Sequence, residues 1–192
     1  MSNTFYFLGQ FLRHPARVAA VAPSSKYLAR AMLQGIDLRP GDVVVEYGPG
    51  TGAFTREVAP LVERGVRYLG IEMHPDFHRC LQQRFPALTF VHGSAEDVDR
   101  YLAEHGLPAP RAVISGLPLA AMPAEAMTTI VERTRKALAP GGQFRQFSYV
   151  HFYVFSGALG LRQLMKRFFP VFTLSRPVFR NMPPAFVYGG RC

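Results

Sequence analysis

The sequence is poor in cysteine, and this limits the kinds of site that it can form. Its 192 residues include only two cysteines, Cys80 and Cys192, which lie far apart and have no CxxC or histidine-rich surroundings. A disulfide framework and a zinc site are therefore disfavoured. We expect no metal site, and a reducing compartment is the simpler assignment.

Long hydrophobic runs are also missing. The longest, residues 152–161, is about half of the ~20 residues that a membrane-spanning helix needs. The apolar start at residues 5–8 has no basic residue before it and no small-residue cleavage site after it, so it does not predict a secretory signal.

Acidic residues are absent from both ends of the chain. All 13 lie between Asp37 and Glu132, whereas 4 basic residues precede that stretch, 8 lie within it and 10 follow it. The three parts thus carry net charges of +4, −5 and +10, which make up the total of +9. Such a distribution predicts that the two ends meet a polyanion, either nucleic acid or an anionic membrane surface.

The chain has enough apolar residues, 48%, for one sizeable core. From Asp37 onward, short β-branched runs alternate with longer helical patterns. The strands expected are 43–45, 67–71, 88–91, 111–115 and 143–149, with 171–174 and 185–188 as a final hairpin. The helices expected are 53–64, 75–84, 124–138 and 157–168. This order predicts a doubly wound α/β domain with a mostly parallel sheet and helices on both faces.

Residues 1–36 form a helical segment that this α/β domain, residues 37–192, does not need. Phe5, Leu8, Phe11 and Leu12 recur at helical spacing and form one apolar face. A second helix, 26–33, has serines before it as caps and Gly35 after it. We interpret residues 1–36 as a lid or membrane-contact segment; the alternative is that the apolar face packs on the core.

The first expected strand runs into a glycine turn, Glu46-Tyr-Gly48-Pro-Gly50-Thr-Gly52, and then into a helix. About twenty residues on, Glu72 ends the second strand, where a carboxylate would accept hydrogen bonds from a ribose. These elements in this order predict an adenosine-containing cofactor. Glu46 would repel a pyrophosphate but would favour a cationic ligand such as S-adenosylmethionine.

This block resembles motif I of the class I S-adenosylmethionine-dependent methyltransferases, and the likeness extends over residues 37–147. The resemblance implies a Rossmann-like methyltransferase fold, S-adenosylmethionine as cofactor and S-adenosylhomocysteine as product. In that family the glycines line the methionine portion, the acid after the second strand binds the ribose, and residues 93–96 face the adenine. The cofactor-binding residues implied are Glu46, Gly48, Gly50, Thr51, Gly52, Glu72, Met73, Ser94, Ala95 and Glu96.

The segment after the fourth strand, Ser115-Gly-Leu-Pro-Leu119, distinguishes between possible substrates. The ribosomal RNA adenine dimethyltransferases have Asn-Leu-Pro-Tyr there, and their amide and ring hold the flipped base. Gly116 and Leu119 occupy those two positions, so the base-recognition groups are missing.

The same segment resembles that of the bacterial phospholipid N-methyltransferases. Further likeness to this family lies in residues 21–32, 142–149 and 181–188; a departure is Val150-His151, where the family has Gly-Pro. The catalytic residues expected are Ser115, Gly116, Tyr149 and His151. The substrate-binding residues expected are Lys26, Tyr27, Leu117, Pro118, Leu119 and Arg180.

The resemblance implies N-methylation of the amine head group of phosphatidylethanolamine and its methylated intermediates, a route to phosphatidylcholine. The expected partners are an anionic membrane surface and the phospholipid, and the expected location is the cytoplasm, at the inner face of the membrane. Two alternatives stay open: an RNA adenine N6-methyltransferase, which the basic ends favour, and a non-catalytic S-adenosylmethionine-binding module.

Deletion of residues 1–14 tests the membrane-contact interpretation. An apolar helical face followed by basic residues inserts at the acyl boundary and attracts anionic lipid. We expect the truncated protein to sediment less with anionic liposomes at low salt than the full chain does. Equal sedimentation of the two proteins would assign the apolar face to the core.

Overall fold

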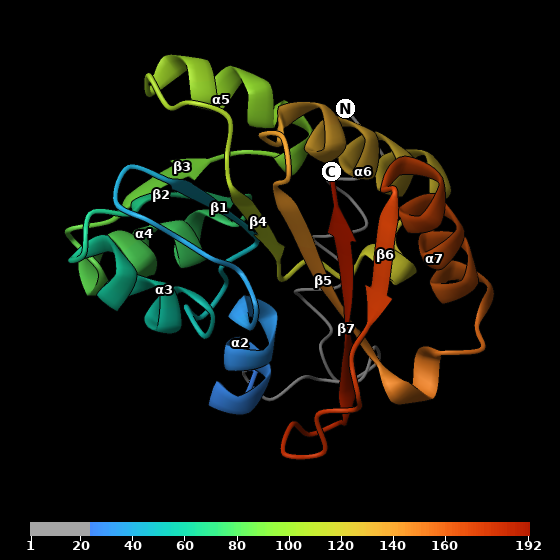
Figure 1. Cartoon of the computed structure of the whole chain (residues 1–192). Helices are drawn as coiled ribbons and strands as arrows, with labels where there is room; N and C mark the ends of the chain where they lie inside the picture. Colours follow the sequence, from blue (N-terminus) through green and yellow to red (C-terminus); the bar gives the residue numbers. More distant parts are fainter. Residues whose placement is uncertain (1–23) are drawn as a thin grey trace.

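The computed structural model describes residues 24–192, which form a seven-stranded sheet in the order β3-β2-β1-β4-β5-β7-β6 (Figure 1). Strands β1 to β5 are parallel, and β7 is antiparallel to both of its neighbours. The predicted mostly parallel sheet with a C-terminal antiparallel hairpin is therefore confirmed. The strands are β1 Val43–Tyr47, β2 Arg67–Glu72, β3 Thr89–His92, β4 Ala112–Ser115, β5 Gln143–Tyr149, β6 Val171–Leu174 and β7 Ala185–Arg191.

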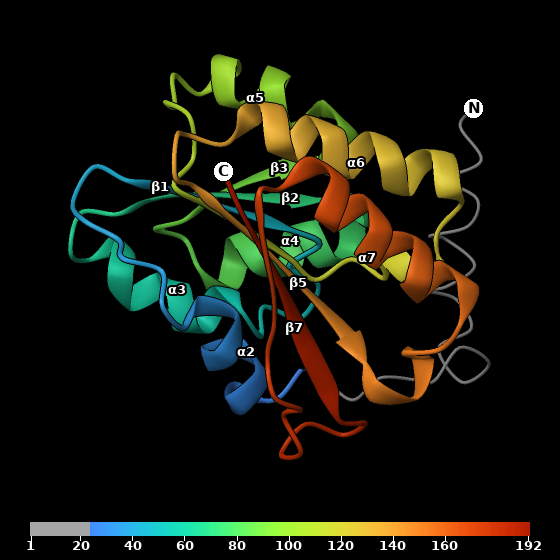
Figure 2. The ribbon, with the colours of Figure 1, turned by 45° about the vertical axis from the view of Figure 1, so that its right-hand side comes forward.

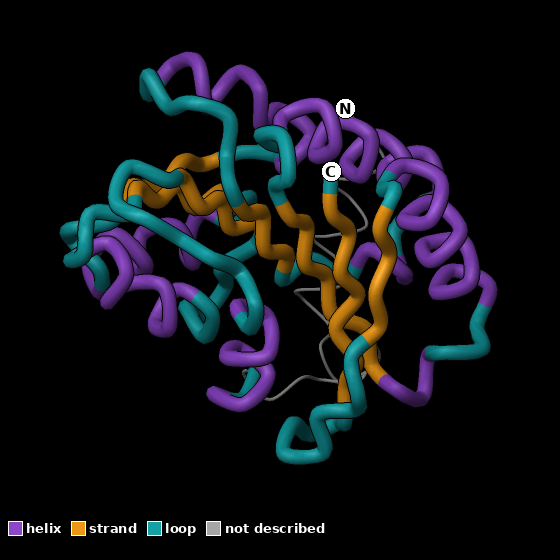
Figure 3. The backbone as a smooth tube through the Cα atoms, viewed as in Figure 1, coloured by secondary structure: helices purple, strands orange, loops and turns teal. Residues whose placement is uncertain are grey.

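Helices cover both faces of the sheet. One face carries α2 to α4 and the other carries α5 to α7 (Figures 2 and 3). The α-helices are α2 Lys26–Leu33, α3 Thr55–Val62, α4 Pro75–Arg84, α5 Val98–Glu104, α6 Ala124–Ala137 and α7 Ser156–Phe168. Three short 3-10 helices are η1 Ala95–Asp97, η2 Leu119–Ala121 and η3 Val150–Phe152. No helix among residues 24–192 is both long enough and apolar enough to cross a lipid bilayer.

Strand β1 shows why the sheet needs helices on both sides. All five of its residues are buried. Val43, Val45 and Tyr47 belong to the core under α5 to α7, while Val44 belongs to the core under α2 to α4. Successive side chains of a strand point to opposite faces, so a strand that is buried at every position needs a layer on each side.

Several elements differ from the sequence-based expectation; β1 continues beyond 43–45 to Tyr47, and α3 is shorter than the expected 53–64. Helix α5 was not expected, because it has only seven residues, of which three are charged; Tyr101 and Leu102 anchor it in the core. Strand β7 continues to Arg191, beyond the predicted end at Tyr188. The last part of β7 contains Gly189 and Gly190, and glycine has a low propensity for β-strands. A β-carbon at Gly190 would lie 2.5 Å from the Phe169 ring, so the missing side chain lets this ring pack on the strand.

Helix α2 is packed into the core of the α/β domain. The Ser25 hydroxyl caps it by accepting a hydrogen bond from the Leu28 N–H, at 3.2 Å. Leu28, Ala29 and Met32 are fully buried in the same cluster as β1 and β4 residues. The apolar face predicted at residues 5–12 lies outside the described residues, so the interpretation of residues 1–36 as a lid or membrane-contact segment stays a prediction.

Candidate active site

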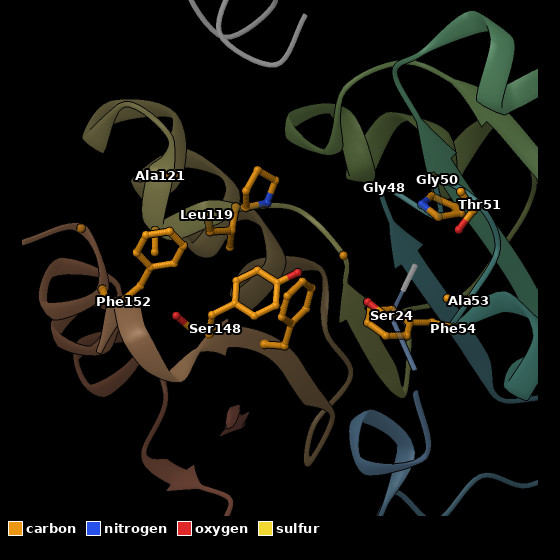
Figure 4. Close-up of a pocket in the computed structure, with 18 of the residues that line it drawn as sticks. Ser24, Gly48, Gly50, Thr51, Ala53, Phe54, Leu119, Ala121, Ser148 and Phe152 are labelled. Carbon is orange, nitrogen blue, oxygen red and sulfur yellow. The ribbon is translucent and has the colours of Figure 1, made fainter. Parts of the chain in front are cut away.

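The site lies where the carboxyl ends of β1, β4 and β5 meet, which is the edge at which open parallel sheets bind ligands. A cavity of about 420 Å³ is found there. Figure 4 shows Gly48, Gly50 and Thr51 on one side of it and Leu119, Ala121 and Phe152 on the other. The cavity thus has one wall made by the glycine turn and an opposite wall made by η2, η3 and the start of α7.

The glycine turn has a backbone that other residues rarely adopt. Gly48, Gly50 and Gly52 have φ angles of 61°, 56° and 78°, in the left-handed region that side chains disfavour. A β-carbon at Gly52 would also lie 2.7 Å from the Phe85 ring of the segment after α4. The turn therefore needs glycine both for its conformation and for helix packing.

The Glu72 carboxylate fixes this turn. Its Oε2 accepts a hydrogen bond from the Gly50 N–H, and its Oε1 accepts one from the His74 N–H, both at 2.8 Å. Each carboxylate oxygen has a second acceptor position. Glu72 can therefore hold the turn and still accept hydrogen bonds from two vicinal hydroxyls.

Glu46 lies beneath the turn, at the N-terminus of α3, and is not a cavity-lining residue. Its Oε2 accepts hydrogen bonds from the hydroxyls of Tyr68 and Thr55, at 2.7 and 2.9 Å. Its Oε1 is buried and has no hydrogen-bond partner among the described residues. Burial, only partly offset by these hydrogen bonds, raises the pKa of Glu46 to about 7.

The loop after β4 lies directly against the glycine turn. The Gly116 N–H donates to the Tyr47 carbonyl at 2.7 Å, and a β-carbon at Gly116 would lie 2.6 Å from the Gly48 carbonyl oxygen. The Ser115 hydroxyl accepts from the Leu117 N–H at 3.3 Å, so it contributes to the shape of the loop. Gln146 holds the loop from β5, because its Nε2 donates to the Leu117 carbonyl at 2.9 Å.

Two of the four expected catalytic residues, Gly116 and Tyr149, line the cavity. Burial raises the pKa of Tyr149 to about 12, so its hydroxyl is neutral at physiological pH. Ser115 is buried outside the lining, and His151 is exposed, with its ring stacked at 5.7 Å on that of Tyr149. The catalytic roles themselves stay predictions.

The residues expected around the adenine form a smaller hollow on the other side of the β4 loop. Met73, Ser94, Ala95 and Leu117 are among those that line it, and Glu96 is not. The hollow holds about 10 Å³, no more than one water molecule occupies. An adenine ring therefore enters it only if side chains of its lining move.

The expected substrate-binding residues lie in two places. Pro118 and Leu119 line the large cavity. Lys26 and Arg180 meet at the Tyr27 ring, with the Lys26 Nζ 5.5 Å and the Arg180 Cζ 4.8 Å from its centroid. Neither cation forms a salt bridge within the part of the chain that the structure describes.

Comparisons with known proteins fit this geometry. A family model described as a methyltransferase domain matches residues 44–142. The ornithine lipid N-methyltransferase of Singulisphaera acidiphila is 34% identical over 98% of this chain and 95% of its own length. The chain belongs to the class I S-adenosylmethionine-dependent methyltransferases.

Other known proteins match the methyltransferase over part of the sequence or in fold only. The ribosomal RNA small subunit methyltransferase A of Phenylobacterium zucineum is 40% identical, but over 41% of this chain and 27% of its own. Magnesium protoporphyrin IX methyltransferase of Synechocystis, solved with bound S-adenosylmethionine, superposes with a TM-score of 0.62 at 13% identity over 100% of this chain and 85% of its own. Fibrillarin of Aeropyrum pernix, also with bound S-adenosylmethionine, gives 0.60 at 16% identity over 86% and 74%.

S-adenosylmethionine is the cofactor of the methyltransferase, and the residues of the glycine turn fit it. A β-carbon at Gly50 would meet only the Gly48 carbonyl oxygen, 3.9 Å away, so the backbone at Gly50 is open to close approach by a ligand. Glu72 has free acceptor positions for ribose hydroxyls. When bound, the cofactor supplies a methyl group on a positively charged sulfur.

Sequence reasoning missed the aromatic lining of the large cavity. The aromatic rings come from separate elements, so no local motif predicts them. The nearest signal is the alternation of residues in β5, which puts Phe147 on the same face as Tyr149. The aromatic lining residues not expected from the sequence are Phe54, Phe77, Phe147, Phe152 and Phe155.

Replacement of Glu72 by alanine removes the two backbone hydrogen bonds that fix the glycine turn, together with the acceptors for the ribose. Because hydrogen bonds to a charged group contribute about 1.5–3 kcal/mol each, we expect Glu72→Ala to weaken S-adenosylmethionine binding by about 10- to 100-fold or more, as measured by calorimetry. Glu125→Ala, an exposed acid on α6, is the control and should bind normally. Unchanged affinity in Glu72→Ala would show that the acid is misassigned.

The raised pKa of Glu46 makes the stability of the apoprotein depend on pH. The Glu46 carboxyl group binds its proton more tightly in the folded state than in the unfolded state, where its pKa is 4.5. The stabilisation of the folded state by this proton is therefore complete below pH 4.5 and is lost as the pH rises to about 7. Glu46→Gln stays neutral, so we expect it to exceed the wild type in stability at pH 8, by about 1–3 kcal/mol, but not at pH 5. Urea denaturation at both pH values measures this, and the same pH dependence in both proteins would contradict it.

Proposed function

We propose that the methyltransferase methylates the amine of a lipid head group, with phosphatidylethanolamine and its methylated forms as acceptors, at a membrane surface. The observation that carries the proposal is the likeness to an ornithine lipid N-methyltransferase over nearly the whole of both chains. The likeness to ribosomal RNA methyltransferases is more partial: it covers 41% of this chain and 27% of the enzyme for that of Phenylobacterium zucineum, and 72% and 51%, at 28% identity, for that of Thermotoga neapolitana.

The β4 loop also argues against a nucleobase substrate. Gly116 stands where the RNA enzymes that the sequence resembles carry an amide side chain. Here even a β-carbon would approach the Gly48 carbonyl oxygen to 2.6 Å. The loop and the glycine turn are therefore too close for a side chain that would orient an adenine amine.

The cavity suits methylation of an aliphatic amine. Only the neutral amine has the lone pair that attacks the methyl group, and none of the described residues that line the cavity is Asp, Glu, Lys, Arg or His. Uncharged, largely apolar surroundings disfavour the ammonium form and so lower the pKa of a bound amine. The neutral Tyr149 hydroxyl can accept a hydrogen bond from the amine and hold it near Gly116, and the released proton passes to solvent.

Apolar and basic side chains around the cavity support action at a membrane. Phe155, which lines the cavity, is 56% exposed, and Phe179 and Met182 in the β6–β7 loop are 74% and 75% exposed. The β6–β7 loop lies at the same end of the molecule as the start of α2 and η3 (Figure 1). Arg180 and Lys26 add positive charge there. Exposed apolar groups with cations beside them are suited to a layer of anionic lipid head groups.

Transfer of labelled methyl groups tests the acceptor. The protein is incubated with labelled S-adenosylmethionine and with liposomes containing phosphatidylethanolamine, liposomes containing ornithine lipid, or RNA. We expect label in phosphatidylethanolamine. Label in ornithine lipid alone would show that the acceptor is a lipid amine other than phosphatidylethanolamine. Label in RNA alone would overturn the proposal. Label in none of the three would favour a binding module without activity.

Substitution of Gly116 tests the geometry of the loop. Because a β-carbon there pushes the loop from the glycine turn, we expect Gly116→Ala to lower kcat by about 100-fold, as displacements near 1 Å do in other enzymes, while the protein stays folded by circular dichroism. Gly160→Ala is the matched control: this glycine lies in α7 outside the cavity lining, and a β-carbon there would meet only the end of the Met127 side chain at 3.5 Å, so the variant should keep a near wild-type rate. A normal rate in Gly116→Ala would mean that the loop does not position the amine.

A further inference from the structure

Five aromatic rings follow one another along the cavity. We call them the aromatic wall: Phe54, Phe147, Tyr149, Phe152 and Phe155. Successive ring centroids lie 5.9, 5.3, 6.3 and 5.6 Å apart, and the rings meet edge to face or tilted. Phe54 follows the glycine turn and is buried, whereas Phe155 precedes α7 and is exposed. The wall therefore extends from the side of the cavity that faces the cofactor residues to its outer rim.

The described lining of the cavity has no charged side chain, so its electrostatic character comes from the faces of these rings and from the hydroxyls of Ser24, Thr51, Ser148 and Ser156. The π face of an aromatic ring carries partial negative charge and attracts a cation within about 6 Å of its centroid. A primary ammonium has three N–H donors that need acceptors, whereas a quaternary ammonium has none and is weakly hydrated. A cavity with several rings and no carboxylate therefore favours the methylated cation over the unmethylated one.

We propose that the aromatic wall is a binding subsite for the methylated ammonium of the lipid head group. This inference rests on the proposed function, because it assigns a place in the cavity to the amine after it has received methyl groups. In each transfer the nitrogen lone pair forms the new N–CH3 bond while the electron pair of the broken S–CH3 bond stays on sulfur. The positive charge thus moves to nitrogen and is stabilised by the ring faces.

A pair of probes separates the effect of charge from that of shape. Hexylphosphocholine carries a trimethylammonium group, and its 3,3-dimethylbutyl isostere has carbon in place of the nitrogen. Binding of each, below its micelle concentration, is measured by calorimetry on the full chain with S-adenosylhomocysteine present. We expect the wild type to bind the phosphocholine roughly 5- to 30-fold more tightly than the isostere.

Variants of the wall test its rings. Phe152→Leu and, at the exposed rim, Phe155→Leu should each reduce the preference for the charged probe, while Phe152→Tyr, which keeps a ring, should retain it. Phe172→Leu removes a half-buried ring outside the cavity and is the matched control. Circular dichroism checks that each variant is folded. If Phe152→Leu does not fold, Phe155→Leu still tests the aromatic wall.

The outcomes distinguish this inference from the proposed function, because the binding experiment needs no methyl transfer. Equal affinity of the wild type for both probes, or an undiminished preference in both leucine variants, would overturn the aromatic subsite even if lipid is methylated. Absence of methyl transfer to any lipid, with the charge preference intact, would overturn the proposed function and leave the subsite for quaternary ammonium groups in place.

Discussion

The Glu72 carboxylate is the interaction on which the rest of the site depends. It joins the end of β2 to the turn that follows β1, because it accepts hydrogen bonds from the N–H groups of both His74 and Gly50. The glycine turn has unusual backbone angles and no side chains of its own to hold it. Once Glu72 fixes it, the Gly48 carbonyl lies against Gly116, and this close approach sets one wall of the cavity.

The charged side chains that the structure describes lie outside the cavity of the candidate active site. The chain has a net charge of +9, yet no charged side chain lines the described cavity. Lys26 of α2 and Arg180 of the β6–β7 loop meet at the Tyr27 ring, close in sequence to Ser24, which lines the cavity. In the proposed function, the basic residues would attract an anionic surface from a distance, while the uncharged interior would keep the amine neutral at the point of reaction.

Much of the fold followed from the sequence pattern. Strand β5 and helices α2 and α4 have the predicted bounds, because alternation, caps and terminal glycine or proline are local signals. The site was only partly predictable. Glu46, expected at the cofactor, lies beneath α3, because it shares a strand face with Val44 rather than with Tyr47. The glycine motif located the turn but did not show which side of it each side chain would occupy.

The sequence by itself determined the order of strands and helices, the cofactor motif and the uneven charge, since each depends on residues that are close along the chain. Tertiary structure alone decided how near Gly116 comes to Gly48 and which rings share the cavity. Phe54 and Phe147 are 93 positions apart and touch because β1 and β5 lie on either side of β4 in one sheet. Sheet order and helix packing bring such residues together, and no local pattern contains that information.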